Sequence, residues 1–178
     1  IGRSNEWPHS HLKPSLISDL KLSLILGCSL IGLKLPLIDA INSVSPDKPC
    51  ATWWTSPKTA EAIARHQAQE ACVHAWDAHL AIGKDLELPQ AVALDGISEW
   101  INVHNEWTQA KDFTIVFAPT DSTESITWNR GGNSVTLSAT ASDLTLFLNG
   151  RRDLNQLKAT GDVAVISGFL AELPAHNS

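Results

Sequence analysis

A glutamate and a histidine stand four residues apart in the segment RHQAQEACVHAWDAH, at Glu70 and His74. If this segment is helical, the two side chains share one face and lie one turn apart along the axis. A carboxylate and an imidazole placed in this way can bind one cation, as in helical metal sites that neighbouring helices complete. The same spacing also arises by chance and then gives a solvated hydrogen-bonded pair. Both interpretations are open at this point, a metal site and a surface contact.

A third metal ligand would have to come from outside this helix. His66 extends the same stripe, but it lies about 12 Å along the axis from His74, which ligand bonds of about 2 Å do not bridge. His9 and His11 are the candidates further upstream.

Three neighbours of the pair have other predicted roles. Cys72 lies about 200° around the helix from Glu70, so we expect it in the core as a small apolar residue. Trp76 is expected in the core as well. Asp77 could orient His74 by a hydrogen bond to the ring nitrogen that does not face the metal.

The helix that carries the pair is predicted over residues 57–82. Ser56 can cap it, Pro57 suits the first helical position, and Gly83 suits the residue after the last turn. A second helix is predicted over residues 89–107, where apolar residues recur every three or four positions. Because the connection between the two is short, we expect them to pack antiparallel.

Upstream of this pair, residues 16–42 are rich in Leu and Ile and predict one or two helices, broken near Gly32 or Pro36. The apolar run at residues 22–33 is about half of the roughly 20 residues that span a bilayer. We therefore expect a buried helix there, and a membrane or export segment is the alternative.

The second half of the chain changes to a period of two, which predicts strands, and Gly131-Gly132 predicts a turn between two of them. We therefore expect an α+β fold, with a helical metal-binding domain at residues 1–110 and a small α+β domain with an antiparallel sheet at residues 111–175. The predicted strands are 113–118, 125–129 and 134–140, and the predicted helices are 141–149 and 162–173.

Composition narrows the class of protein. The chain has 178 residues, is 43 % apolar and carries a net charge of -6, with its 13 Lys and Arg residues scattered. A folded protein is expected, and neither nucleic acid nor a membrane is an expected partner.

Three cysteines without CxxC spacing argue against a disulfide framework or a thiolate zinc site and favour the cytoplasm. Because the chain contains no methionine, we expect the native start to lie upstream of Ile1.

The segment CATWWTSPKTAEAIARHQAQEACVHAWDAHLAIG, followed by ALDGISEW, resembles the centre of the mycothiol-dependent maleylpyruvate isomerase family of actinobacterial type. In that family an HE-x3-H-R-W-D-A pattern precedes an A-x-D-G-[IV]-x-E element. Gln69 and Ala75 depart from the pattern, but neither position is implied as a ligand. The matching residues are Glu70, His74, Trp76, Asp77, Asp95, Gly96 and Glu99.

The C-terminal half extends the resemblance to about residues 38–172. The family's D-L-x-L-x-L-x-G-R element corresponds to residues 143–151, and its strand-borne tryptophan corresponds to Trp128. In residues 1–37 the family's W-T-x-x-x-L-x-x-H-L pattern, which supplies the first metal-binding histidine, is echoed only by Trp7, His9 and His11-Leu12.

This resemblance implies a DinB-like helical bundle in which Glu70, His74 and His11 hold a divalent metal, with zinc expected. It also implies mycothiol as thiol cosubstrate. In the family's reaction the mycothiol thiolate adds to the cis double bond of maleylpyruvate, the resulting single bond rotates, and the thiolate leaves to give fumarylpyruvate. Thiol transfer to other small electrophiles uses the same activation.

Arg151, at the Gly-Arg element, is the implied catalytic residue and the candidate for binding an anionic substrate or the thiol cofactor. Arg152 is the adjacent candidate, and a surface arginine after a helix end is the simpler alternative. At the level of the whole chain, the alternative to an enzyme is a non-catalytic metal-binding or ligand-binding relative of the same bundle.

Overall fold

A computed structural model of the chain describes residues 38–106, 108 and 111–172. The predicted helices upstream of residue 38, the apolar run at residues 22–33 and the candidate ligands His9 and His11 lie outside the described residues. In the part of the chain that is described, no helix is both long enough and apolar enough to cross a bilayer.

The first long helix, α3 (Ala60–Leu80), carries Glu70 and His74. It begins three residues later than predicted, because the hydroxyl of Thr59 and not that of Ser56 accepts the backbone N–H of Ala62. The helix ends before Gly83, as the sequence predicts, and Gly83 has a φ of 75°.

The second helix, α4 (Gln90–His104), packs antiparallel to α3, as predicted. His66 lies against Glu99, and Gln69, later in α3, lies against Gly96, earlier in α4. The two helices therefore run in opposite directions. A Cβ atom at Gly96 would come within 3.3 Å of the side chains of Gln69 and Thr145. A glycine there permits the close approach of three helices, α3, α4 and the helix that carries Thr145.

The second half forms a four-stranded sheet in the order β2-β1-β3-β4. Strand β1 pairs antiparallel with β2 but parallel with β3, so the sheet is mixed and the prediction of an antiparallel sheet is wrong for the central pair. The short strand β4 was not predicted. The elements are β1 (Phe113–Pro119), β2 (Ile126–Asn129), β3 (Asn133–Ala139), α5 (Ala141–Leu148), the 3-10 turn η1 (Leu154–Gln156), β4 (Lys158–Gly161) and α6 (Ala164–Glu172).

The predicted turn at Gly131-Gly132 connects β2 and β3, but these two strands do not pair with each other. The chain leaves β2 on one side of β1, crosses the start of β1 at Asp112, and enters β3 on the other side, where Asn133 pairs with Phe113. Gly132 has a φ of 61°, and a Cβ atom on it would lie 1.7 Å from the carbonyl oxygen of Asp112. The glycine therefore allows two backbones to cross, rather than turning a hairpin.

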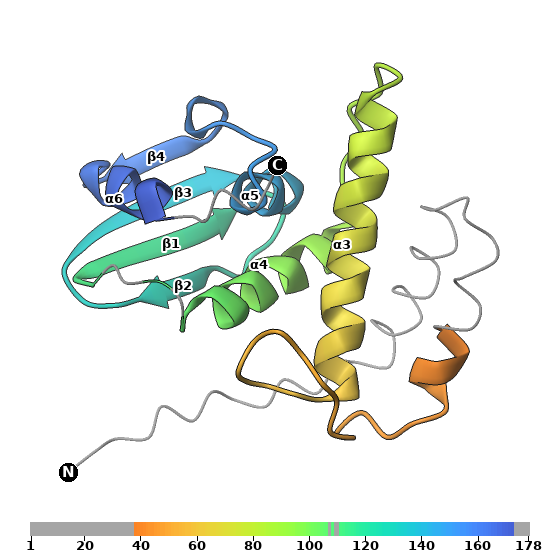
Figure 1. Cartoon of the computed structure of the whole chain (residues 1–178). Coiled ribbons are helices and arrows are strands. Elements are labelled where there is room, and N and C mark those ends of the chain that lie inside the picture. The colour runs from red at the N-terminus through yellow and green to blue at the C-terminus, as the bar shows by residue number, and fades with distance from the viewer. Residues whose placement is uncertain (1–37, 107, 109–110, 173–178) are drawn as a thin grey trace, which may run out of the picture.

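Helix α4 belongs to the same hydrophobic core as the sheet. Its residues Ile97, Trp100 and Ile101 are buried in one cluster with side chains of β1, β2, β3, α5 and α6. Figure 1 shows α3 on the far side of α4 and α5 from the sheet. A second cluster joins α3 to α4 and α5 and contains Cys72 and Trp76, which confirms the expectation that both lie in the core.

Candidate metal site

The side chains of Glu70 and His74 face each other on an exposed side of α3. Nε2 of His74 lies 3.4 Å from Oε2 of Glu70, and the side chains are 62 % exposed for His74 and 41 % for Glu70. Two ligands of a tetrahedral ion with bonds of about 2.1 Å lie about 3.4 Å apart. The separation therefore fits two groups that share a cation, and both remain open to solvent.

The other ring nitrogen of His74 faces Asp77, as the sequence suggested. Nδ1 of His74 lies 3.2 Å from Oδ2 of Asp77. A hydrogen bond from Arg151 is the main reason why the pKa of Asp77 lies below its ordinary value, and it outweighs the opposing effect of burial. Asp77 is therefore ionised at neutral pH and can only accept hydrogen bonds.

Arg151 reaches this group from the turn after α5. Its Nε and Nη2 atoms lie 3.3 and 3.0 Å from the two carboxylate oxygens of Asp77, and its Nη1 donates to the carbonyl of Asn149 at 2.6 Å. These contacts use three of the five N–H protons of the guanidinium. The fold thus brings together Glu70, His74, Asp77 and Arg151, although 74 residues separate the last two in the sequence.

A complete ligand set is not formed by the described residues alone. Within them, no group of three or more His, Cys, Asp or Glu side chains is placed to hold a metal ion. The third ligand predicted from the sequence, His11, and its alternative His9 lie outside this part of the chain.

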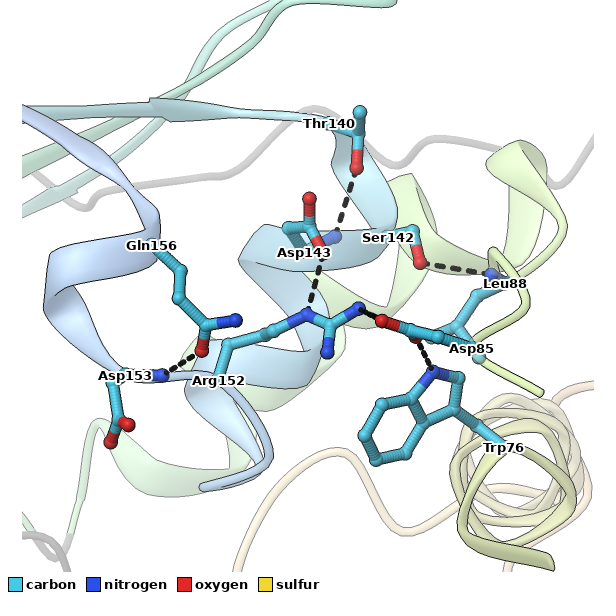
Figure 2. Close-up of polar contacts among 9 residues, drawn as sticks. All are labelled: Trp76, Asp85, Leu88, Thr140, Ser142, Asp143, Arg152, Asp153 and Gln156. Carbon is cyan, nitrogen blue, oxygen red and sulfur yellow. Dashed lines mark hydrogen bonds and ion pairs between the residues drawn. The ribbon is translucent and has the colours of Figure 1, made fainter. Parts of the chain in front are cut away.

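Arg152, the adjacent candidate, is bound by side chains of the protein itself (Figure 2). Its guanidinium donates to Asp143 of α5 at 2.8 Å and to Asp85 of the α3–α4 connection at 2.7 Å. It also lies 5.0 Å from the ring centre of Trp76, whose Nε1 donates to Asp85. Arg152 therefore fastens the end of α3 to α5. We refer to Trp76, Asp85, Asp143 and Arg152 together as the arginine clamp.

Sequence reasoning missed the arginine clamp, although two of its members carried a signal. Trp76 and Asp143 stand at positions of the family pattern, which marks them as more than generic core and surface residues. A further link lies beside the clamp, because the hydroxyl of Ser142 accepts the backbone N–H of Leu88 at 2.9 Å (Figure 2).

The acidic residues of the second family element pair with α3 one turn before Glu70. Nδ1 of His66 lies 3.0 Å from Oε1 of Glu99, and the guanidinium of Arg65 binds both oxygens of Asp95. These pairs hold α4 against α3. They give Asp95 and Glu99 a structural role in the helical part of the chain.

The fold and the site together define an α+β protein whose helical part presents a carboxylate–imidazole pair. Residues 35–79 match the family model of the mycothiol maleylpyruvate isomerase N-terminal domain. This match supports the resemblance found in the sequence, and it includes Glu70, His74 and Asp77 but not Arg151. No curated protein and no solved structure matches the chain significantly.

Proposed function

We propose that this chain binds a divalent metal ion through Glu70 and His74 and uses mycothiol in an isomerisation of the maleylpyruvate type or in a thiol transfer. The observation that carries the proposal is the 3.4 Å approach of Nε2 to Oε2 inside the segment that matches the family model. We propose His11 as the third ligand, with His9 as its alternative.

Zinc is the expected metal because imidazole and carboxylate are ligands that it accepts in open catalytic sites. When bound, such a cation would keep a coordinated thiol in its thiolate form at neutral pH. The proposed location is the cytoplasm, on the basis of the cysteine pattern.

Arg151 is proposed to bind the anionic substrate or the thiol cosubstrate. Three of its five N–H protons bond to Asp77 and Asn149, and within the described residues the other two make no hydrogen bond. A planar guanidinium suits a carboxylate, and the side chain is 19 % exposed, so a ligand can reach it.

A second candidate function is metal or ligand binding without catalysis. The exposure of both Glu70 and His74 favours it, because a site that performs chemistry usually excludes water.

Metal analysis of the purified chain, residues 1–178, tests the site. We expect the wild type to hold zinc close to one equivalent, and Glu70→Ala and His74→Ala to lose it. His79→Ala is the matched control, since His79 lies on the same helix and bonds to the carbonyl of Ala75. An unchanged metal content in Glu70→Ala would eliminate the ligand assignment.

Turnover then separates the two functions. We expect conversion of maleylpyruvate that requires added mycothiol and falls at least tenfold in Arg151→Met. If the metal-loaded protein is inactive on maleylpyruvate and on a panel of electrophiles, the non-catalytic function is the correct one.

A further inference from the structure

We propose that Asp77, held by Arg151, is a positioning residue that keeps the ring proton of His74 on Nδ1 and so presents the lone pair of Nε2 toward Glu70. This inference deepens the proposed function, on which its significance for metal binding rests. It starts from the two carboxylates that face one imidazole.

Each ring nitrogen of His74 faces a different carboxylate. Nδ1 lies 3.2 Å from Asp77, and Nε2 lies 3.4 Å from Glu70. A neutral imidazole has a single N–H, and an ionised carboxylate can only accept. The two carboxylates therefore compete for one proton, and the nitrogen that loses it is left with a lone pair aimed at an anion.

Asp77 is the better-placed acceptor because its carboxylate is fixed. Both of its oxygens accept from Arg151, and Arg151 is itself fixed by its bond to the carbonyl of Asn149. The side chain of Glu70 is 41 % exposed and that of Asp77 is 36 % exposed, so the two carboxylates differ in the contacts with Arg151 and not in their access to water. The shorter contact and the restrained partner both place the proton on Nδ1.

The arginine clamp explains why Arg151 stays in reach of Asp77. The next residue, Arg152, is bound to Asp85 and Asp143, and its guanidinium lies over Trp76, the residue that precedes Asp77 on α3 (Figure 2). The turn after α5 is thus attached to α3 beside the site. The position of Asp77 relative to Arg151 follows from this attachment.

With the proton on Nδ1, two atoms that bear lone pairs face each other 3.4 Å apart at Nε2 of His74 and Oε2 of Glu70. This arrangement is unfavourable when nothing lies between them and favourable when a cation does. Carboxylates that orient a metal-binding histidine commonly change metal affinity by about 10- to 100-fold. Asp77 would therefore prepare His74 as a ligand before any metal arrives.

The test is the tautomer of His74 in the metal-free, 15N-labelled chain of residues 1–178, at a pH where the ring is neutral. Long-range 1H–15N spectra distinguish a protonated from an unprotonated ring nitrogen, and His74→Gln identifies the signals. We expect a protonated Nδ1 in the wild type and a shift toward the Nε2–H form in Asp77→Ala. Glu87→Ala, which removes an exposed carboxylate on the α3–α4 connection, should leave the signals unchanged.

Arg151→Gln provides a second test that leaves the sequence of α3 unaltered, in case Asp77→Ala does not fold. We expect a smaller shift in the same direction, because Asp77 remains present but is no longer held. An unshifted spectrum in this variant would overturn the role of Arg151. A wild type protonated on Nε2, or no change in Asp77→Ala with its amide spectrum intact, would overturn the inference as a whole.

Zinc titration of the same samples separates this inference from the proposed function. We expect Asp77→Ala to bind zinc about 10- to 100-fold more weakly than the wild type. If the wild type binds no zinc but its tautomer depends on Asp77, the proposed function fails and the inference stands. If Glu70 and His74 bind zinc and the tautomer of His74 is the same in Asp77→Ala as in the wild type, the inference fails and the metal site stands.

Discussion

Nδ1 of His66 lies 3.0 Å from Oε1 of Glu99, a residue that is only 5 % exposed. Burial alone would lower the pKa of His66. The hydrogen bond and charge of Glu99, together with the charge of Glu70, outweigh burial and raise this pKa above its ordinary value. The pair links α3 to α4 one turn from the candidate metal site.

The pairing of His66 with Glu99 predicts a pH-dependent stability. Because the folded-state pKa is raised, the contribution is fully present below the unfolded value of about 6.5 and is lost as pH rises through the folded value. We expect Glu99→Gln to lower the free energy of unfolding by about 2 kcal/mol at pH 6 and by less at pH 8.5. Urea denaturation of both proteins across this range measures the difference.

Comparison of two proteins is needed because His104, which burial shifts to a lower pKa, also titrates differently in the folded state. His104 is present in both proteins, and the charge of His66 also lowers its pKa, so the measured difference includes this coupling together with the contact between His66 and Glu99. A difference that stays constant with pH would contradict the assignment to His66.

The arginine clamp predicts a measurable energetic coupling between Arg152 and Asp85. Lysine cannot reproduce the forked contacts of Arg152 with Asp85 and Asp143, so Arg152→Lys should cost about 1–2 kcal/mol of unfolding free energy. In a double-mutant cycle with Asp85→Asn, we expect a coupling of about 1 kcal/mol from denaturant unfolding. Strictly additive losses would show that the contact adds nothing to stability.

The chain crossing at Asp112 predicts that two glycines with positive φ respond differently to alanine. Gly83 has open space around its missing Cβ, so Gly83→Ala should cost about 1–2 kcal/mol from backbone strain alone. Gly132→Ala adds a clash with the carbonyl of Asp112 and should cost about 3 kcal/mol or more. Equal shifts of the thermal midpoint would mean that the crossing tolerates a side chain.

Cys72 is predicted to be chemically unreactive in the folded protein. Burial raises the pKa of its thiol to about 11, so very little thiolate is present at pH 8. We expect iodoacetamide to modify Cys72 at least tenfold more slowly in buffer than in denaturant, as followed by peptide mass mapping. Equal rates under the two conditions would contradict its burial beside Trp76.

Local patterns in the sequence predicted where helices and strands lie better than they predicted which strands pair with each other. The i, i+4 spacing placed Glu70 against His74 because both belong to one helix, and the period of two located β1, β2 and β3. The pairing of β1 with β3 was missed because a Gly-Gly pair signals a change of direction but not which strand lies beside the next one. Strand β4 is short and mostly exposed, so it shows no alternation.

The composition of the site depended on contacts that no local pattern contains. Arg151 was a candidate through the family resemblance, but its contact with Asp77 joins residues far apart in the chain and follows from how α5 packs on α3 and α4. The capping of α3 by Thr59 instead of Ser56 shows the same limit at short range, because both residue types cap well.

Trp76 and Asp77 are consecutive residues of α3, so their side chains leave the helix about 100° apart. Trp76 contacts the guanidinium of Arg152, and Asp77 accepts a hydrogen bond from Arg151. Two adjacent arginines therefore hold the helix at two points of its circumference. These two contacts oppose rotation of α3 about its own long axis. Two arginines in the second half of the chain therefore fix the direction in which Glu70 and His74 point. Loss of the contacts of these arginines would rotate both side chains away from a shared cation, although α3 itself would remain a helix.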